Sequence, residues 1–333
     1  MTNDTNNQNT NEESNMKGVF NQTRGFGVEI EYSRPAVVTN QDIASRISAR
    51  GIDCRVEGYN HETRRWWKIV SDSSVRATTP DQIGRNEIVS PILSGENNGF
   101  IILNTVLEVL NDLGCTVNAS CGLHVHHDVR PTIREAQKKD AQAFIEKTIK
   151  FVAKFEHCIY KLIAPSRLSR QFSTPVRKTY YVDGAPMYSL MNGGTEKNEK
   201  VKKQVKACVG GERMSRTQYS RTCGLNMYHV FTRGSIEFRY HQGSLNYEKI
   251  SNWIVVTQMM LNAVESKRTV HLSYVDGGRK GMGKFRKALG LDKTSCGHGQ
   301  EANEWMKKTF TKFNRREADY TRARDYEYVM GGV

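Results

Sequence analysis

The chain has 333 residues, of which 38% are hydrophobic and 9% aromatic, so it can bury a substantial core in one large or two ordinary domains. Its net charge is +14, and it has no run of about eighteen apolar residues that would predict a membrane-spanning helix. Seven cysteines without paired spacing favour free thiols over a disulfide framework, so we expect a soluble protein of the cytoplasm with no membrane partner.

The N-terminal segment, residues 1–17, consists almost entirely of Asn, Thr, Gln and Glu and contains no apolar stretch. It is expected to be a disordered tail and not a signal peptide. The first strand is predicted at residues 25–32, where apolar side chains alternate with Glu29 and Glu31. One face of this strand would be apolar and the other acidic.

Two further elements are predicted between residues 86 and 113. Residues 86–91 form a candidate strand that carries Glu87 and should end at Pro91. A helix is expected at residues 98–113, because apolar residues recur at helical spacing and Gly114 follows.

The segment Cys121 to Asp128 holds three of the nine histidines of the chain. If it is a strand, His124, His126 and Asp128 lie on one face and His127 lies on the other, with Leu123 and Val125. An ionisable face would again be backed by a mostly apolar one.

Two helices and one strand are predicted after Asp128. Thr132 and Glu135 have the spacing of a capping box for a helix that extends to about Ile159. Residues 235–241 alternate so that Glu237, Arg239 and His241 share one face. Asn246 is the expected N-cap of the next helix.

The remaining segments show little periodicity. Residues 165–216 are predicted to be an insertion, within a basic segment, residues 161–221, that has 13 Lys or Arg and 4 Asp or Glu. Residues 18–267 would form the main domain and 268–333 a C-terminal extension. The pattern favours an α+β domain whose sheet is antiparallel or mixed and has helices on its apolar face.

The polar face of the predicted sheet indicates metal chemistry. Several carboxylates beside two imidazoles would repel one another unless cations bridge them. A carboxylate-rich ligand set suits Mg²⁺ or Mn²⁺ better than zinc. A nearby guanidinium, from Arg239, could neutralise charge on a phosphoryl group, although the chain has no P-loop motif.

Five segments, in this order, resemble the motifs of the putative amidoligase family, which is related to glutamine synthetase and glutamate–cysteine ligase. They are Phe26-Gly-Val-Glu-Ile-Glu31, Asn86-Glu-Ile-Val-Ser-Pro91, Asn118-Ala-Ser-Cys-Gly-Leu-His-Val-His126, Arg221-Thr-Cys-Gly-Leu-Asn226 and Ser235-Ile-Glu-Phe-Arg239. The resemblance implies a glutamine-synthetase-like curved antiparallel sheet with helices on one face. It also implies an ATP- and metal-dependent ligase that joins a carboxylate donor to an amine acceptor through an acyl phosphate.

The same resemblance implies roles for individual residues. One cation would be bound by Glu29, His124 and Glu237, and another by Glu31 and Glu87. The transferred phosphate would contact Arg239 and Arg221. The nucleotide or its phosphates would contact His126 and Asn226.

Two alternatives remain open from the sequence. The run His124-Val-His-His-Asp128 resembles the core of the metallo-β-lactamase motif, which would make the protein a metal-dependent hydrolase, although Val129 stands where that motif has another histidine. The basic segment, residues 161–221, could instead bind nucleic acid through its phosphates.

Overall fold

The computed structural model describes residues 20–134, 138–167, 173, 175–176, 181–182, 185–186, 223–227, 229–230, 233–271, 273, 275–292 and 297–314. Two compact units make up the chain. The strand-rich unit contains residues 22–127 and 238–254, and the helical unit contains residues 1–21, 128–237 and 255–333. The expected N-terminal tail and most of the expected insertion lie outside the described residues.

A seven-stranded sheet has the order β2-β3-β4-β1-β5-β9-β8. The strands are β1 (Phe26–Pro35), β2 (Cys54–Val56), β3 (Trp67–Ser71), β4 (Gln82–Val89), β5 (Gly122–Asp128), β8 (Leu225–Asn226) and β9 (Ser235–Gln242). The boundary between the units falls within β5 and within β9. The helical unit also contains a two-stranded sheet of β6 (Tyr181–Val182) and β7 (Ala185–Pro186).

The large sheet is mixed, which is one of the two alternatives that the sequence pattern left open, so the antiparallel sheet implied by the family resemblance needs correction at one strand pair. Strand β1 is antiparallel to β4 and β5, and β3 is antiparallel to β4, but β2 is parallel to β3. The parallel pair arises because residues 57–66 form a loop that returns the chain to the starting end of β2 before β3 begins. The α+β class is confirmed.

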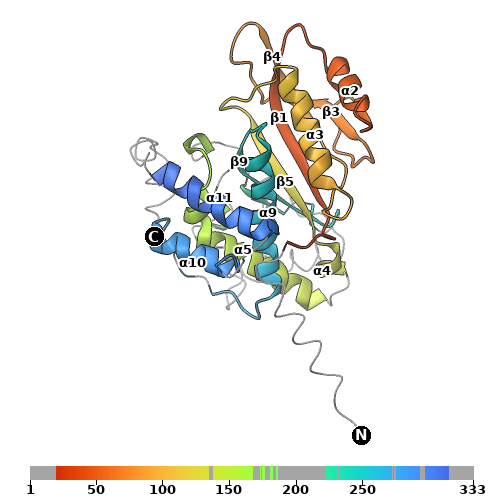
Figure 1. Cartoon of the computed structure of the whole chain (residues 1–333). Coiled ribbons are helices and arrows are strands. Elements are labelled where there is room, and N and C mark those ends of the chain that lie inside the picture. The colour runs from red at the N-terminus through yellow and green to blue at the C-terminus, as the bar shows by residue number, and fades with distance from the viewer. Residues whose placement is uncertain are drawn as a thin grey trace. The chain divides into compact units, whose positions relative to one another are not determined.

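The apolar face of the sheet is buried against helices of the strand-rich unit. Helix α2 (Asn40–Ser48) begins with a capping box of Thr39 and Asp42, and α3 (Gly99–Asp112) runs alongside β1 (Figure 1). Phe26 of β1 packs against Phe100 of α3 with ring centroids 5.2 Å apart. The strand residues on this face are fully buried: Val28, Ile30, Tyr32, Ile69, Ile88, Leu123 and Val125. This burial explains the strict alternation in the sequence of β1 and β5.

Most predicted elements are present. The predicted strands correspond to β1, β4, β5 and β9, and the first predicted helix corresponds to α3. Helix α9 (Tyr247–Glu265) is capped as expected, because the Lys249 backbone N–H donates to Asn246 Oδ1 at 3.0 Å. This cap satisfies one of the free donors at the helix start.

The capping box predicted at Thr132 and Glu135 is wrong. The helical stretch is divided into α4 (Arg130–Arg134) and α5 (Lys138–Tyr160), and Glu135 lies outside the described residues. Because α4 begins at Arg130, Thr132 is already inside the helix. Its hydroxyl donates to Glu265 Oε1 at 2.6 Å and joins α4 to α9 within the helical unit.

The helical unit has its own apolar core. Phe155 of α5 packs against Phe151 at 5.0 Å and against Phe285 at 5.1 Å between ring centroids, which joins α5 to α10 (Arg279–Ala288). Its other described helices are η1 (Pro165–Arg167) and α11 (Gly297–Asn314). Among the described residues, no helix is both long and apolar enough to cross a membrane.

Candidate metal centre

The polar face of the sheet is assembled by strand register. Glu31 of β1 lies directly opposite Glu87 of β4, and Glu29 of β1 lies directly opposite His124 of β5. Residues two apart on a strand share a face, so all four side chains project from the same side of the sheet. The strand phase predicted from the sequence is therefore the observed one.

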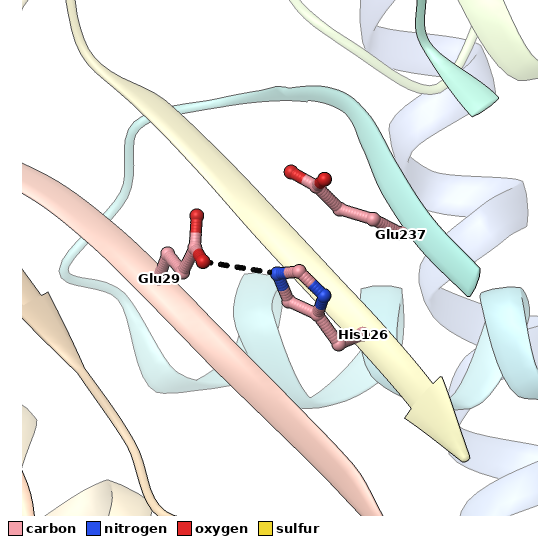
Figure 2. Close-up of side chains that lie close together, drawn as sticks. All are labelled: Glu29, His126 and Glu237. Carbon is pink, nitrogen blue, oxygen red and sulfur yellow. Dashed lines mark ion pairs between the residues drawn. The ribbon is translucent and has the colours of Figure 1, made fainter. Parts of the chain in front are cut away.

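Histidines of β5 contact the two carboxylates of β1. Glu29 Oε2 lies 2.9 Å from His124 Nδ1, and Glu29 Oε1 lies 3.1 Å from His126 Nε2 (Figure 2). Glu31 Oε1 lies 3.5 Å from His124 Nε2, while the Gly122 backbone N–H donates to Glu31 Oε2 at 2.7 Å. His124 therefore bridges the two carboxylates.

Two carboxyl groups of this face, those of Glu29 and Glu87, have pKa values shifted in opposite directions. Burial tends to raise the pKa of Glu29, but His126 and His124 outweigh it, so this pKa lies well below its usual range. Burial and the charges of Glu29 and Glu31 raise the pKa of Glu87 well above its usual range, against a smaller opposing effect of Arg239. The negative charge of Glu87 is thus less well compensated than that of Glu29.

Two groups of possible metal ligands lie within the strand-rich unit. The ligand atoms of Glu29, Glu87 and His124 all lie within 4.8 Å of one another, and so do those of Glu31, Asp72 and Glu87. Glu87 belongs to both groups, whereas each carboxylate of β1 belongs to one. Glu87 therefore joins two neighbouring ligand groups.

Asp72 was missed by sequence reasoning. It follows β3, whose residue Val70 pairs with Glu87, so an alternation from Lys68 through Val70 brings Asp72 to the polar face. The sequence did not predict this strand, because β3 is buried on both faces from Trp67 to Val70 and its residues do not alternate in polarity.

Three of the expected site residues belong to the helical unit. Asn226 Nδ2 donates to Glu237 Oε2 at 2.6 Å, and both residues are buried. Figure 2 draws Glu237 together with Glu29 and His126. The unit boundary falls directly after Glu237. The two ligand groups that share Glu87 belong entirely to the strand-rich unit. Arg221 lies outside the described residues.

The metallohydrolase interpretation is not favoured by the placement of His127 and Asp128. His127 is fully buried on the opposite face, where its ring meets Phe238 with centroids 5.9 Å apart. Asp128 Oδ2 is bound by Arg130 Nη2 at 2.6 Å. Neither residue occurs in any ligand group formed by the described part of the chain.

A protein-family model described as "Putative amidoligase enzyme" matches residues 22–261, from the segment before β1 to near the end of α9. The chain belongs to this amidoligase family. No curated protein matches the sequence. A solved structure, the bifunctional glutathione synthetase from Pasteurella multocida, is similar at 12% identity and a TM-score of 0.46, over 96% of this chain and 53% of that one. The amidoligase chain therefore spans about half the length of that protein.

The ligand groups of the amidoligase fit a hard divalent cation. Four of the five side chains are carboxylates and one is an imidazole, whereas zinc sites usually have several histidine or cysteine ligands. A cation beside Glu87 would also offset the repulsion that raises its pKa. The residues present thus suit Mg²⁺ or Mn²⁺.

Proposed function

We propose that this amidoligase joins a carboxylate to an amine at the expense of ATP, with Mg²⁺ or Mn²⁺ bound by the carboxylates of its sheet. The supporting observation is the direct opposition of Glu31 and Glu87, with a carboxylate oxygen of Asp72 within 4.8 Å of an oxygen of each. Like charges that face each other across a sheet are destabilising unless a cation lies between them. An enzyme that uses a nucleoside triphosphate needs such clustered carboxylates, because they bind the divalent cations that neutralise the phosphates.

The proposed reaction has two steps. An oxygen of the substrate carboxylate attacks the γ-phosphorus of ATP, the bond to the β-phosphate oxygen breaks, and ADP and an acyl phosphate are formed. The amine then attacks the acyl carbon, inorganic phosphate leaves with the electron pair of its C–O bond, and loss of a proton from nitrogen gives the amide. A divalent cation would neutralise charge on the phosphate oxygens.

The side chains of the site would bind metal ions, the transferred phosphate or the nucleotide. Glu29, Glu31, Asp72, Glu87 and His124 hold cations, and the family resemblance implies Glu237 as a further ligand. Arg239, whose charge already acts on Glu87, faces the transferred phosphoryl group. Arg221 would contact the same group. His126 and Asn226 contact the nucleotide or its phosphates.

The finer parts of the proposal concern fold and substrates. The sheet would be the curved sheet of glutamine synthetase relatives, with residues 18–267 as the catalytic domain. The insertion and the C-terminal extension would select the carboxylate donor and the amine acceptor. A nucleic acid held by residues 161–221 could carry one of them, which is supported by the net charge of +14.

Phosphate release from ATP tests the proposed reaction. Purified protein is incubated with Mg²⁺ or Mn²⁺ and pairs of carboxylates and amines drawn from amino acids, polyamines and short peptides. We expect release that needs both partners, disappears in chelator and is lost in Glu29→Ala. Glu248→Ala, at an exposed position of α9, is the matched control and should behave as wild type. Normal release by Glu29→Ala would contradict the assignment of the site.

A further inference from the structure

Lys68 lies on the same face of the sheet as the metal centre. The register places Lys68 of β3 opposite Val89 of β4, Val89 opposite Glu29 of β1, and Glu29 opposite His124 of β5. These four residues form one row across the sheet, with Lys68 two strands, or about 10 Å, from Glu29. A lysine that is only 3% exposed therefore borders the carboxylates.

The ammonium group of Lys68 is bound by a loop and not by an acid. Its Nζ donates to the Asn60 carbonyl at 3.2 Å, to Asn60 Oδ1 at 2.7 Å and to the Glu62 carbonyl at 2.8 Å. An ammonium has three donors, so these bonds use all of them. The three acceptors are two backbone carbonyls and one side-chain amide oxygen, so none of them belongs to a carboxylate. Lys68 thus holds the loop and has no donor left for a phosphate.

Glu57, the first residue of the same loop, holds the loop together by further hydrogen bonds. The carboxylate of Glu57 accepts from Asn60 Nδ2 at 2.9 Å, from Arg64 Nε at 3.1 Å and from Trp66 Nε1 at 2.7 Å. Asn60 therefore joins Glu57 to Lys68. A ten-residue connection between two strands, residues 57–66, is in this way held in one conformation beside the polar face.

The tip of this loop presents aromatic surface to solvent. Tyr59 is 67% exposed, and its hydroxyl lies 2.9 Å from Nε2 of the exposed His61. The two rings meet edge to face with centroids 4.9 Å apart, which holds the tyrosine ring in place. These two residues flank Asn60, the residue bound by Lys68. An oriented aromatic ring beside a phosphate-binding site is suited to stack a nucleobase.

We propose that residues 57–66 form the base-binding wall of the nucleotide site, with Tyr59 as the stacking side chain and Lys68 as the positioning residue that fixes the wall beside the metal centre. This inference rests on the proposed use of ATP. The spacing along the row allows the phosphates to lie at Glu29 and His124 while the base reaches the loop.

Calorimetric binding to the full-length protein separates base recognition from phosphate recognition. The probes are adenylyl imidodiphosphate and tripolyphosphate, each with Mn²⁺, since tripolyphosphate has the charge but no base. Tyr59→Ala should weaken binding of the nucleotide analogue about tenfold and change tripolyphosphate binding less than twofold. Tyr59→Phe, which keeps the ring, should bind both probes nearly as wild type does.

Variants of the two residues that hold the loop test its positioning. Lys68→Met and Glu57→Ala should each reproduce the selective loss of nucleotide affinity and speed hydrogen exchange in residues 57–66. Both variants remove hydrogen bonds that order the loop, but only Lys68→Met removes a positive charge from the face of the sheet. A loss of nucleotide affinity in Lys68→Met alone would therefore overturn the positioning role. Lys249→Met makes the same change at an exposed lysine of α9 and should alter neither readout.

The remaining outcomes identify which proposal fails. Equal wild-type affinity for the two probes, or equal losses for both in Tyr59→Ala, would overturn the base-binding wall and leave the metal centre standing. Absence of Mn²⁺-dependent tripolyphosphate binding in the wild type would overturn the proposed function, and the base-binding wall with it.

Discussion

Glu31 and Glu87 lie directly opposite each other in the antiparallel pairing of β1 and β4. Two carboxylates in this relationship repel, and the pKa of Glu87 is raised by burial and then by the charges of Glu29 and Glu31. A carboxylate oxygen of Asp72 also lies within 4.8 Å of an oxygen of each residue of this pair. Without a metal ion, the clustered carboxylates thus lower the stability of the folded protein. The same carboxylates are the proposed metal ligands.

Replacement of Glu87 by glutamine should separate stability from metal binding. In chelator, Glu87→Gln should unfold at a higher temperature than wild type, because one of two facing charges is removed, with a gain of about 0.2–1 kcal/mol. Added Mn²⁺ should raise the melting temperature of the wild type but not of the variant. Thermal unfolding followed by circular dichroism, with and without Mn²⁺, measures both effects.

Glu248→Gln is the matched control for this experiment. Glu248 is exposed in the first turn of α9, so the same chemical change should leave the Mn²⁺ shift at its wild-type value. A full Mn²⁺ shift in Glu87→Gln would contradict the role of Glu87 as a ligand.

The sequence predicted strands where one face is apolar and the other is not. In β1 and β5 the buried face and the ionisable face alternate residue by residue, so both the strand and its phase could be predicted. Strand β3 could not, because Trp67, Lys68, Ile69 and Val70 are all buried and the period-two pattern is absent. Asp72 was therefore missed along with the strand that positions it.

Strand pairing and helix breaks were harder to predict, because they depend on contacts between distant residues. Glu87 was predicted as a candidate ligand, but its register with Glu31 is set by long-range pairing. Likewise, Thr132 has the local spacing of a cap, yet its hydroxyl is bound by Glu265, 133 residues away. Such distant partners cannot be predicted from the local sequence.

Two histidines of β5 should respond differently to substitution. His124→Asn should abolish Mn²⁺ binding measured by calorimetry, because His124 lies between Glu29 and Glu31 on the polar face. His127→Asn should retain Mn²⁺ binding but lower the free energy of unfolding by about 2 kcal/mol, since its fully buried ring packs against Phe238. The reverse ranking in Mn²⁺ binding would show that the assigned strand faces are wrong.

His127 should also make stability depend on pH. Burial, with Arg24 and His126 nearby, holds the pKa of His127 well below its usual value, so the ring is neutral in the folded protein. Below about pH 6.5 the unfolded chain binds a proton that the folded chain does not, and the free energy of unfolding falls as pH decreases. The slope due to this group reaches at most about 1.4 kcal/mol per pH unit.

Urea unfolding of wild type and His127→Asn between pH 5 and 7.5 isolates this contribution, because other titrating groups affect both proteins. The stability difference between them should shrink as the pH falls. Parallel curves for the two proteins would show that His127 is protonated to the same extent in the folded and unfolded states.

Gly84 of β4 should not tolerate a side chain. A Cβ at this position would lie 2.7 Å from the Val75 carbonyl oxygen and 2.7 Å from the Ala77 backbone nitrogen, and neither backbone atom can move without shifting the chain. The next residue, Arg85, already has a left-handed backbone with φ of 61°, within the irregular pairing that leads to Glu87. Gly84→Ala should therefore cost about 1–3 kcal/mol in urea unfolding and weaken Mn²⁺ binding.

Gly283→Ala in α10 is the matched control, because a Cβ there meets no atom within 4 Å. At this exposed helical position alanine should stabilise by about 0.5–1 kcal/mol. If Gly84→Ala were as well tolerated as Gly283→Ala, loop residues 75–77 would not constrain β4. The position of Glu87 would then depend on its strand partners alone.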